Sequence, residues 1–498
     1  MKHLLNFLLL FLLLTAAGCS KKEAPKPVDN HTDTDPPKTE QVYGSLKDTN
    51  IRYFGRWDFS NKDQYVSYWG GAYIKVDFTG TTVKVKVGNT SDFYAKIDNG
   101  PWISYKQSSG IINLTPTPLT NGTHSLSVAQ GKDYDYQFKF DGLVLDNNAV
   151  TKTPAVMSSL IEYIGDSITA GYTCDQANVS DYAWVASEAL GAEHTQIAFP
   201  GIKLTSGFPD VGMDVQYLKM QSDQTKSQTG DWNFQGYTPK LVVINLGTND
   251  NNGVPDEEFQ KAYVNLLTTV RAKFPDAEIF ALRTFLGVKS SGTLAAVVTR
   301  MAAGDLKVHY IDTDGWLKSG DYSDGIHPNA AGHIKAAALL KPILEPYLNG
   351  TPPPVPLPDG TYKIINRNSK LAMDVKGALT ESGTPITQWT YGGGDNQRWT
   401  MTHIGAGVYK IIGVQSGRAL QIENKSPAAG AALQIGDYSG SNDQKFIISK
   451  NAEGYYTITS LLSGKVVEVG GQSDAPGASI DVWDNNGGIH QQWSFEAP

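Results

Sequence analysis

Two residues whose types suit acyl transfer stand far apart in this sequence. Ser167 follows a strand-like apolar run at 160–164, and His327 precedes a long helical stretch. A serine hydroxyl is a weak nucleophile until a base takes its proton, and histidine is the side chain best suited to that role. Asp324, three residues before the histidine, can orient the imidazole and stabilise its charged form. These residue types indicate nucleophilic hydrolysis if the fold brings them together.

Acyl transfer also requires hydrogen-bond donors at the position of the developing oxyanion. The backbone N–H groups of Ser167 and Gly201 and the side-chain amide of Asn249 are three candidates. Gly201 suits this role because a residue without a Cβ lets a substrate approach the backbone closely. In open parallel α/β sheets, ligands bind beyond the carboxyl ends of the strands, and all three residues follow strand-like runs. We therefore expect them to converge on one rim with His327.

Simpler structural roles compete with these assignments. Ser167 can merely cap the turn that follows it. His333 is the nearest histidine to His327, but it lies six residues farther along the chain, on another face of the predicted helix. Asp166 and Asp250 are expected to hold loops in place. His327 therefore remains the preferred base.

The sequence predicts no metal site and no cofactor. His327 and His333 do not have the His-Glu-x-x-His spacing of a zinc site. Asp312 and Asp314 fall short of the ligand set of a calcium loop. We infer that no metal takes part in the chemistry.

The residues around these side chains predict an α/β hydrolase domain over 155–349. Strand-like runs alternate with helical stretches, which favours a parallel sheet covered on both faces. The runs lie at 160–164, 195–199, 241–246, 278–282 and 308–311. The segment "VSDYAWVASEALG" predicts a helix that is capped by Ser180 and ended by Gly191.

A β-sandwich domain, jelly-roll-like, is predicted over 42–150. Valines alternate with lysines in "TTVKVKVGN", as in a strand with one wet face. Asn-Gly and Asp-Asn-Gly turns separate further strand-like pieces. This part of the sequence shows no catalytic constellation.

The C-terminal part repeats itself after a proline linker at 350–358. Trp399, Phe446 and Trp493 are spaced at intervals of 47 residues, and Asp374, Gln421 and Glu468 keep the same interval. Two sets of positions in one register predict three stacked β units, that is, a β-trefoil over 359–498.

The N-terminus predicts a lipoprotein signal peptide over 1–18. Small residues directly before Cys19 resemble the bacterial lipobox, which implies cleavage there, lipid attachment to the Cys19 thiol, and a polar tether over 19–41. The alternative is an ordinary secretory signal with an incidental cysteine. Ser20 after the cysteine favours the outer membrane in that class. The expected location is therefore the bacterial outer membrane or cell surface, or else secretion.

Charge and cysteine content exclude other classes of protein. The formal net charge is −8, and no basic run interleaved with aromatics appears, so nucleic-acid binding is not expected. Cys174 is the only other cysteine, so no disulfide stabilises the mature fold. We expect Cys174 to be a small buried thiol.

The ordered set around Ser167 resembles the SGNH (GDSL) hydrolase superfamily. Its four blocks stand here as "GDS" at 165–167, Gly201, "GTND" at 247–250 and "DGIH" at 324–327. The resemblance implies that Ser167, Asp324 and His327 are catalytic, and that Ser167, Gly201 and Asn249 form the oxyanion site. Some relatives resemble a Ser-His dyad, so the need for Asp324 stays open.

Two further resemblances point to glycans. A β-sandwich directly before an SGNH domain is similar to carbohydrate esterase family 2, whose members remove O-acetyl groups from plant-wall polysaccharides. The block "FPGIKL" departs from the Ser-Gly-Lys-Gly type expected in that family.

The three-fold repeat resembles the ricin-type lectin domain, also grouped as carbohydrate-binding family 13. The resemblance implies a sugar site in the first repeat, formed by Asp374, Trp389 and Asn396. In the second repeat Gly436 stands in place of the tryptophan, so that site is expected to be lost. In the third, His490 stands in place of the asparagine, and binding there stays open.

Together these features predict a multidomain, secreted and surface-anchored serine esterase. It is expected to remove O-acetyl groups from a xylan- or mannan-like polysaccharide or oligosaccharide. The trefoil is expected to bind the polymer, and the lipid is expected to anchor the protein to the membrane. Two alternatives remain: a glycan-binding lipoprotein with a silent hydrolase domain, and an SGNH lipase or thioesterase.

Overall fold

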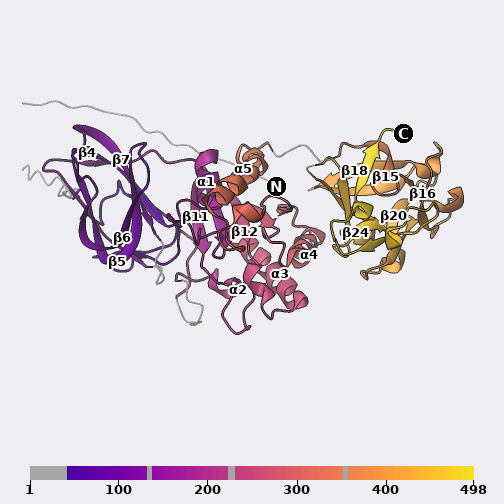
Figure 1. Ribbon diagram of the computed structural model, residues 1–498, viewed down its shortest axis with the longest axis horizontal. Helices are drawn as coiled ribbons and strands as arrows, with labels where there is room; N and C mark the ends of the chain where they lie inside the picture. Colours follow the sequence, from indigo (N-terminus) through magenta and orange to yellow (C-terminus); the bar gives the residue numbers. More distant parts are fainter. Residues whose placement is uncertain (1–41, 132–136, 222–229, 352–356, 406, 452) are drawn as a thin grey trace, which may run out of the picture. The chain divides into compact units, whose positions relative to one another are not determined.

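The computed structural model describes six stretches of the chain: 42–131, 137–221, 230–351, 357–405, 407–451 and 453–498. Figure 1 shows three strand-containing parts along the sequence. The expected signal peptide (1–18), Cys19 and the tether (19–41) lie outside the described residues, and so do positions 352–356 of the expected linker. In the described part of the chain, no helix is long and apolar enough to cross a membrane.

The first part is a nine-stranded antiparallel sheet that encloses an apolar core. Its longest strand, β5, pairs with β8 through its first half and with β7 through its second, so the sheet bends through this strand. Val83, Val85 and Val87 are buried and the lysines between them are partly exposed, which confirms the expected alternation. The strands are β1 (Arg52–Phe54), β2 (Trp57–Asp58), β3 (Tyr65–Ser67), β4 (Tyr73–Gly80), β5 (Val83–Ile97), β6 (Ile103–Asn113), β7 (Gly122–Gln130), β8 (Phe138–Leu145) and β9 (Thr151–Lys152).

The second part is a five-stranded parallel sheet with the order β11-β10-β12-β13-β14. Two strands, at 278–282 and 308–311, have the predicted bounds, whereas β11 begins and ends earlier than the predicted 195–199. The strands are β10 (Leu160–Gly165), β11 (Glu193–Ala198), β12 (Leu241–Asn245), β13 (Glu278–Leu282) and β14 (Val308–Ile311). The helices are α1 (Tyr182–Leu190), α2 (Met213–Gln216), α3 (Asp256–Lys273), α4 (Ser290–Ala302) and α5 (Ala330–Leu348).

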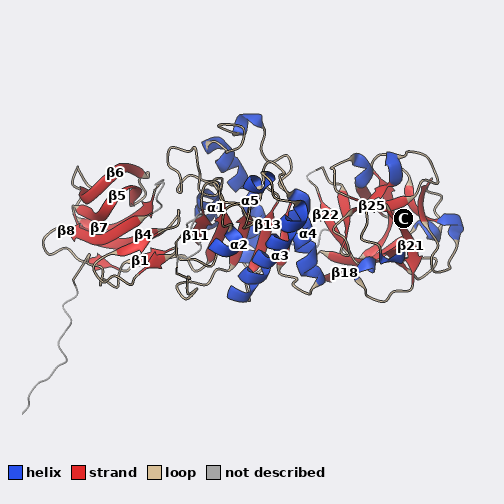
Figure 2. Ribbon diagram, turned by 90° about the horizontal axis from the view of Figure 1, so that it is seen from below, coloured by secondary structure: helices blue, strands red, loops and turns tan. Residues whose placement is uncertain are grey.

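Both faces of this sheet are buried. Along β12, Leu241 and Val243 pack in the core that contains residues of α1 and α5, while Val242 and Ile244 pack in the core that contains residues of α3 and α4. Figure 2 shows these helices against the strands. Such double burial explains why the strands read as continuous apolar runs in the sequence.

Helix α1 begins one residue later than predicted. Asp181, and not Ser180, is its N-cap: the carboxylate accepts hydrogen bonds from Ala183 N at 2.8 Å and Trp184 N at 3.1 Å. The Ser180 hydroxyl instead donates to Gln176 O. Asp181 caps because the extended backbone at that residue aims its side chain at the first turn. Gly191 ends the helix in the left-handed conformation, as predicted.

A fully buried arginine joins the first two sheets. Arg56 Nη1 donates to Tyr217 O at 2.6 Å and to Lys219 O at 2.8 Å. Glu162, on β10, is also fully buried and accepts from the hydroxyls of Tyr217 and Tyr237. Burial raises the pKa of Glu162, although the positive charge of Arg56 opposes this rise. The segment between β11 and β12 is thus held by Arg56, from the connection between β1 and β2, and by Glu162 of β10.

The third part is a twelve-stranded β-structure in which the 47-residue repeat is visible in the contacts. Trp399, Phe446 and Trp493 are fully buried, and the two indoles each donate to a carbonyl 26 residues earlier. The glutamine two positions before each of these residues donates to a carbonyl seven residues earlier: Gln397 to Thr390, Gln444 to Asp437 and Gln491 to Asp484. This agreement confirms the predicted three-fold arrangement.

The strands of this third part pair antiparallel throughout the described residues. They are β15 (Gly360–Asn366), β16 (Ala372–Val375), β17 (Ile386–Trp389), β18 (Trp399–Gly405), β19 (Val408–Gly413), β20 (Ala419–Ile422), β21 (Ala431–Gly436), β22 (Phe446–Lys450), β23 (Tyr456–Ser460), β24 (Val466–Val469), β25 (Ile480–Trp483) and β26 (Trp493–Glu496).

Candidate active site

The structure brings Ser167 and His327 into direct contact. Ser167 Oγ lies 2.9 Å from His327 Nε2, although 160 residues separate them in the chain. Ser167 follows the end of β10 at Gly165, and His327 lies three residues before the start of α5. The serine is nearly buried, with 4% of its surface exposed. The pair therefore lies at the carboxyl end of the parallel sheet, at the expected rim.

Asp324 contacts the other nitrogen of the same imidazole. Its Oδ2 lies 2.8 Å from His327 Nδ1, and its Oδ1 accepts from the backbone N–H groups of Ile326 and His327 at 3.0 and 2.8 Å. These hydrogen bonds lower the pKa of Asp324 to about 2, so the carboxylate is ionised at neutral pH. An ionised acceptor at Nδ1 selects the tautomer that leaves Nε2 free to accept the serine proton.

The two predicted oxyanion segments are joined to each other. Asn249, in the 3₁₀ turn Thr248–Asn251, donates one Nδ2 hydrogen to Ile202 O at 2.9 Å, next to Gly201. The second hydrogen of this amide remains for another acceptor. Gly201 has φ +81°, a conformation that favours glycine. Within the described residues, no protein group accepts a hydrogen bond from Ser167 N or Gly201 N.

Asp166 and Asp250 are fully buried and hold backbone segments, as predicted. Asp250 accepts from Leu204 N at 2.8 Å and Thr205 N at 3.0 Å, which fixes the loop after β11 against the loop after β12. Asp166 accepts from Ile168 N at 2.9 Å, and burial raises its pKa to about 6. Asp250 thus acts through the loops that it joins, whereas Asp166 lies near enough to His327 for the positive charge of a protonated imidazole to oppose the rise in its pKa.

His333 occupies a different environment from His327. It is fully buried, its Nδ1 accepts from Tyr182 N at 3.1 Å, and burial lowers its pKa to about 4. It therefore lies in the core as a neutral side chain. The described residues also contain no group of three or more His, Cys, Asp or Glu side chains that could hold a metal ion.

Tyr172 is a neighbour of the Ser167–His327 pair that the sequence analysis did not single out. Its ring centroid lies 5.0 Å from that of His327, and its backbone N–H donates to Ser167 O. The turn after Ser167 folds back on itself, and that turn directs the ring at the imidazole. Nothing in the sequence pattern indicated that Tyr172, five residues after Ser167, would lie beside the histidine.

The first trefoil repeat brings its three predicted sugar ligands near each other. Asn396 Nδ2 donates to Asp374 Oδ2 at 2.9 Å, and Asp374 is 5% exposed. Trp389 ends β17, the strand that pairs with the strand of Asp374, and this residue is 51% exposed. A buried carboxylate beside an exposed indole is an arrangement suited to the hydroxyls and the apolar face of a pyranose ring.

The other two repeats differ at the same positions. In the second, Gln444 Nε2 donates to Gln421 Oε1 and Gly436 offers no ring. In the third, Gln491 Nε2 donates to Glu468 Oε2 at 2.7 Å, and Trp483 is 45% exposed.

Three segments of the chain match known protein families. Residues 53–154 match the carbohydrate esterase 2 N-terminal family, and residues 163–334 match the GDSL-like lipase/acylhydrolase family. Residues 354–436 and 442–497 match the ricin-type beta-trefoil lectin domain-like family.

Curated relatives carry esterase names. The chain is 29% identical to the cellulase/esterase CelE of Acetivibrio thermocellus over 316 residues, which are 58% of this chain and 38% of CelE. It therefore spans less than two thirds of that relative. It is also 22% identical to an acetylxylan esterase / glucomannan deacetylase of Cellvibrio japonicus, over 60% of this chain and 90% of that protein.

A solved structure agrees with this likeness. A family two carbohydrate esterase from Clostridium thermocellum, in complex with cellohexaose, superimposes with a TM-score of 0.54 at 28% identity. The match covers 60% of this chain and 99% of that one. The chain thus carries a carbohydrate esterase family 2 N-terminal domain and a GDSL-like hydrolase domain, followed by a ricin-type β-trefoil domain.

Proposed function

We propose that this protein is a serine esterase that removes O-acetyl groups from a plant-type polysaccharide such as a xylan or mannan. The observation that carries the proposal is the continuous series of contacts from Asp324 through His327 to Ser167, beside the Gly201 and Asn249 segments. The esterase names of the relatives support the same reaction class.

In the first half of the reaction, His327 Nε2 takes the proton of Ser167 Oγ as the oxygen attacks the ester carbonyl carbon. The carbonyl π bond breaks, and the oxyanion accepts hydrogen bonds from Ser167 N, Gly201 N and the second Nδ2 hydrogen of Asn249. The tetrahedral intermediate then expels the sugar alkoxide, which receives the proton from His327. The products are a free sugar hydroxyl and acetyl-Ser167.

Water completes the cycle by the same steps. His327 removes a proton from a water molecule, the hydroxide attacks the acetyl carbonyl, and collapse returns the Ser167 hydroxyl and releases acetate. Asp324 stays ionised throughout and stabilises the imidazolium that forms twice in each cycle.

The trefoil is proposed to bind the polysaccharide through Asp374, Trp389 and Asn396. A weak glycan site tethered to a catalytic domain raises the local concentration of polymer at the serine without any new contact in the active site. The silent-hydrolase alternative is disfavoured because the serine and histidine are already in hydrogen-bond contact.

The lipid anchor is proposed from the sequence around Cys19. Cys19→Ala should move the protein from the membrane fraction to the soluble secreted fraction of an expressing Gram-negative cell. Equal membrane retention of this variant would reject Cys19 as the lipidation site.

Acetate release from a panel of substrates tests the proposed activity. We expect release from acetylated xylan or mannan oligosaccharides, and slower hydrolysis of octanoyl and longer esters. A preference for the longer esters would instead support the lipase or thioesterase alternative.

A further inference from the structure

A cavity lies between the first two sheets, and neither Ser167 nor His327 belongs to its lining. Its volume is about 480 Å³, within the range typical of small-molecule sites. It is lined by residues of β4, β5 and β7 and by Glu193 and His194, the first two residues of β11. Because β10 and β11 run parallel, this is the amino end of the sheet, opposite the rim that carries Ser167.

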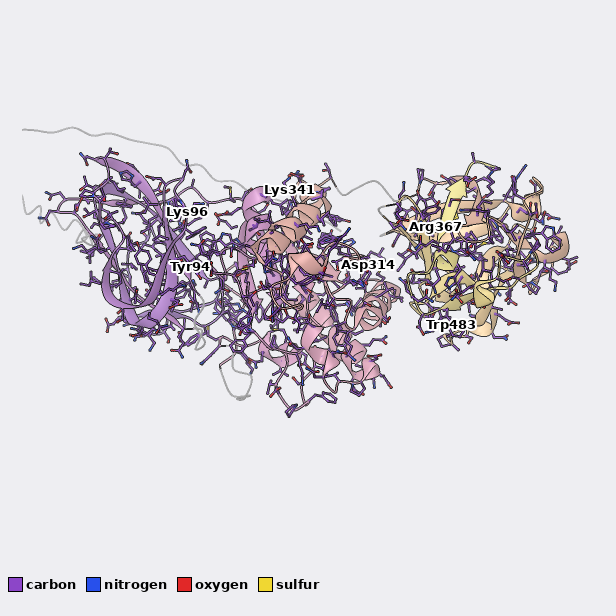
Figure 3. All side chains as sticks on the ribbon, viewed as in Figure 1. Tyr94, Lys96, Asp314, Lys341, Arg367 and Trp483 are labelled. Atoms are coloured by element: carbon purple, nitrogen blue, oxygen red, sulfur yellow. The ribbon has the colours of Figure 1, made fainter. Side chains whose placement is uncertain are left out.

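The outer face of the first sheet supplies charged side chains to this cavity. Along β4, Ile74 and Val76 are fully buried in the core, whereas Lys75 and Asp77 line the cavity. Lys96 of β5 and Asp98, the first residue after that strand, also line the cavity. Figure 3 labels Lys96, together with Tyr94 of the same strand. The period of two along β4 therefore places Lys75 and Asp77 on one face.

The carboxylates outnumber the cations. Lys75 Nζ lies 2.7 Å from Glu193 Oε1 and is thereby neutralised. Lys96 Nζ lies 3.5 Å from Glu188 and 5.7 Å from the centroid of the Trp102 ring. Asp77 and Asp98 add two further carboxylates, and Asp98 Oδ2 lies 2.8 Å from His124 Nδ1. Four carboxylates thus stand against two ammonium groups in the lining, which disfavours an anionic ligand.

Three ring nitrogens at the cavity are also unpaired. Trp102 Nε1, Trp184 Nε1 and His194 Nε2 are buried and have no hydrogen-bond partner among the described residues. All three residues belong to the cavity lining. Burial lowers the pKa of His194 to about 3, so its ring is neutral. These nitrogens are closed off from solvent because the rings pack on one another: the centroids of Trp102 and Trp184 lie 5.3 Å apart and those of Trp184 and His194 lie 4.4 Å apart. The three rings therefore form an aromatic wall of the cavity.

We propose that this cavity is a second carbohydrate-binding site, which takes a neutral segment of a polysaccharide. Carboxylates accept from sugar hydroxyls, the ammonium of Lys96 donates to them, and aromatic side chains of the lining supply apolar surface for a pyranose ring. The proposal depends on the cavity alone and is independent of the chemistry at Ser167.

The test uses the full-length protein with xylohexaose, cellohexaose and mannohexaose as probes. Hydrogen–deuterium exchange is followed in the peptides that contain residues 123–128, 154–157 and 188–194, which include cavity-lining positions. The test variant is Asp77→Asn with Lys96→Met. The matched control is Asp63→Asn with Lys86→Met, which makes the same chemical changes in the same part of the chain but outside the cavity lining.

At least one hexasaccharide should slow exchange in these three peptides, and the test variant should need at least tenfold more of it for the same effect. The control variant should behave like the unchanged protein. The proposal is overturned if no hexasaccharide protects these peptides, or if protection of the test variant occurs at the same concentration. If the double variant does not fold, Lys96→Met alone decides by the same criterion.

Hydrolysis of 4-nitrophenyl acetate separates this proposal from the esterase proposal. Both variants should retain the unchanged rate, because none of their four positions contacts Ser167 or His327. If the test variant loses protection by the hexasaccharide but hydrolyses 4-nitrophenyl acetate at the unchanged rate, the substitutions have altered the cavity and not the active site. Absence of hydrolysis in the unchanged protein would reject the esterase proposal and leave the exchange result valid.

Discussion

At the scale of single residues, the contacts from Asp324 through His327 to Ser167 are suited to making a hydroxyl nucleophilic, as we propose. The pKa of Asp324 is lowered to about 2 by three hydrogen bonds, two of them from backbone N–H groups of its own turn. The acid is therefore ionised over the whole range in which a histidine can act as a base. Its charge orients the imidazole and favours proton transfer from the serine.

Asp324→Asn tests whether the acid is needed. An asparagine amide can present its N–H to Nδ1 and so select the wrong tautomer, which should lower kcat by roughly 10²–10⁴. The measurement is steady-state hydrolysis of a soluble acetyl ester. A change of less than threefold would mean that Ser167 and His327 work as a dyad.

Asn249→Ala tests the oxyanion site. Losing one preorganised donor should lower kcat by roughly 10²–10³ with little change in KM. Asn251→Ala, in the same 3₁₀ turn and exposed, is the matched control. An unchanged kcat in the Asn249 variant contradicts the assignment.

At the scale of secondary-structure elements, the sheet places the site and the loops complete it. Strand positions followed from apolar runs because both faces of the sheet are buried. The cap of α1 was predicted one residue too early because Ser180 and Asp181 are both good caps, and only the backbone conformation distinguishes them. The ring of Tyr172 beside His327 depends on a tertiary turn that leaves no periodic signal.

The Asp181 cap should make stability depend on pH. Burial raises the pKa of this carboxyl from 3.8 to about 7, so the folded state binds its proton more tightly than the unfolded state. Its stabilising contribution is complete below about pH 4 and is lost as the pH rises through 7. Each unit of pKa shift corresponds to about 1.4 kcal/mol.

Asp181→Asn keeps an acceptor for Ala183 N and Trp184 N and removes the titration. The free energy of unfolding, measured by urea denaturation, should fall between pH 4 and 7 in the unchanged protein relative to the variant. A difference between the two proteins that does not vary with pH would contradict the raised pKa.

At the scale of the whole molecule, a GDSL-like hydrolase domain is followed by a ricin-type β-trefoil domain, for which we propose sugar binding. The 47-residue repeat was readable from the sequence because each unit must supply the same buried aromatic and the same glutamine. The cavity between the first two sheets was not readable, because it depends on how residues of β4, β5 and β11 meet in space.

Asp374→Ala tests the role of the trefoil. Removing this carboxylate should abolish retention on a xylose- or galactose-containing matrix, because sugar hydroxyls lose their acceptor and Asn396 loses its partner. Hydrolysis of a small acetyl ester should not change. Gln421→Ala, at the equivalent position of the second repeat, is the control and should be retained normally. Equal retention of both variants rejects the site in the first repeat.

The most direct test of the central claim is the rate of acetate release by Ser167→Ala. The missing hydroxyl leaves a fold whose core is unchanged, so the circular dichroism spectrum should match that of the unchanged protein. We expect turnover of an acetylated xylan oligosaccharide to fall by roughly 10⁴–10⁶. Release at a rate close to that of the unchanged protein would show that the esterase chemistry does not take place at this serine.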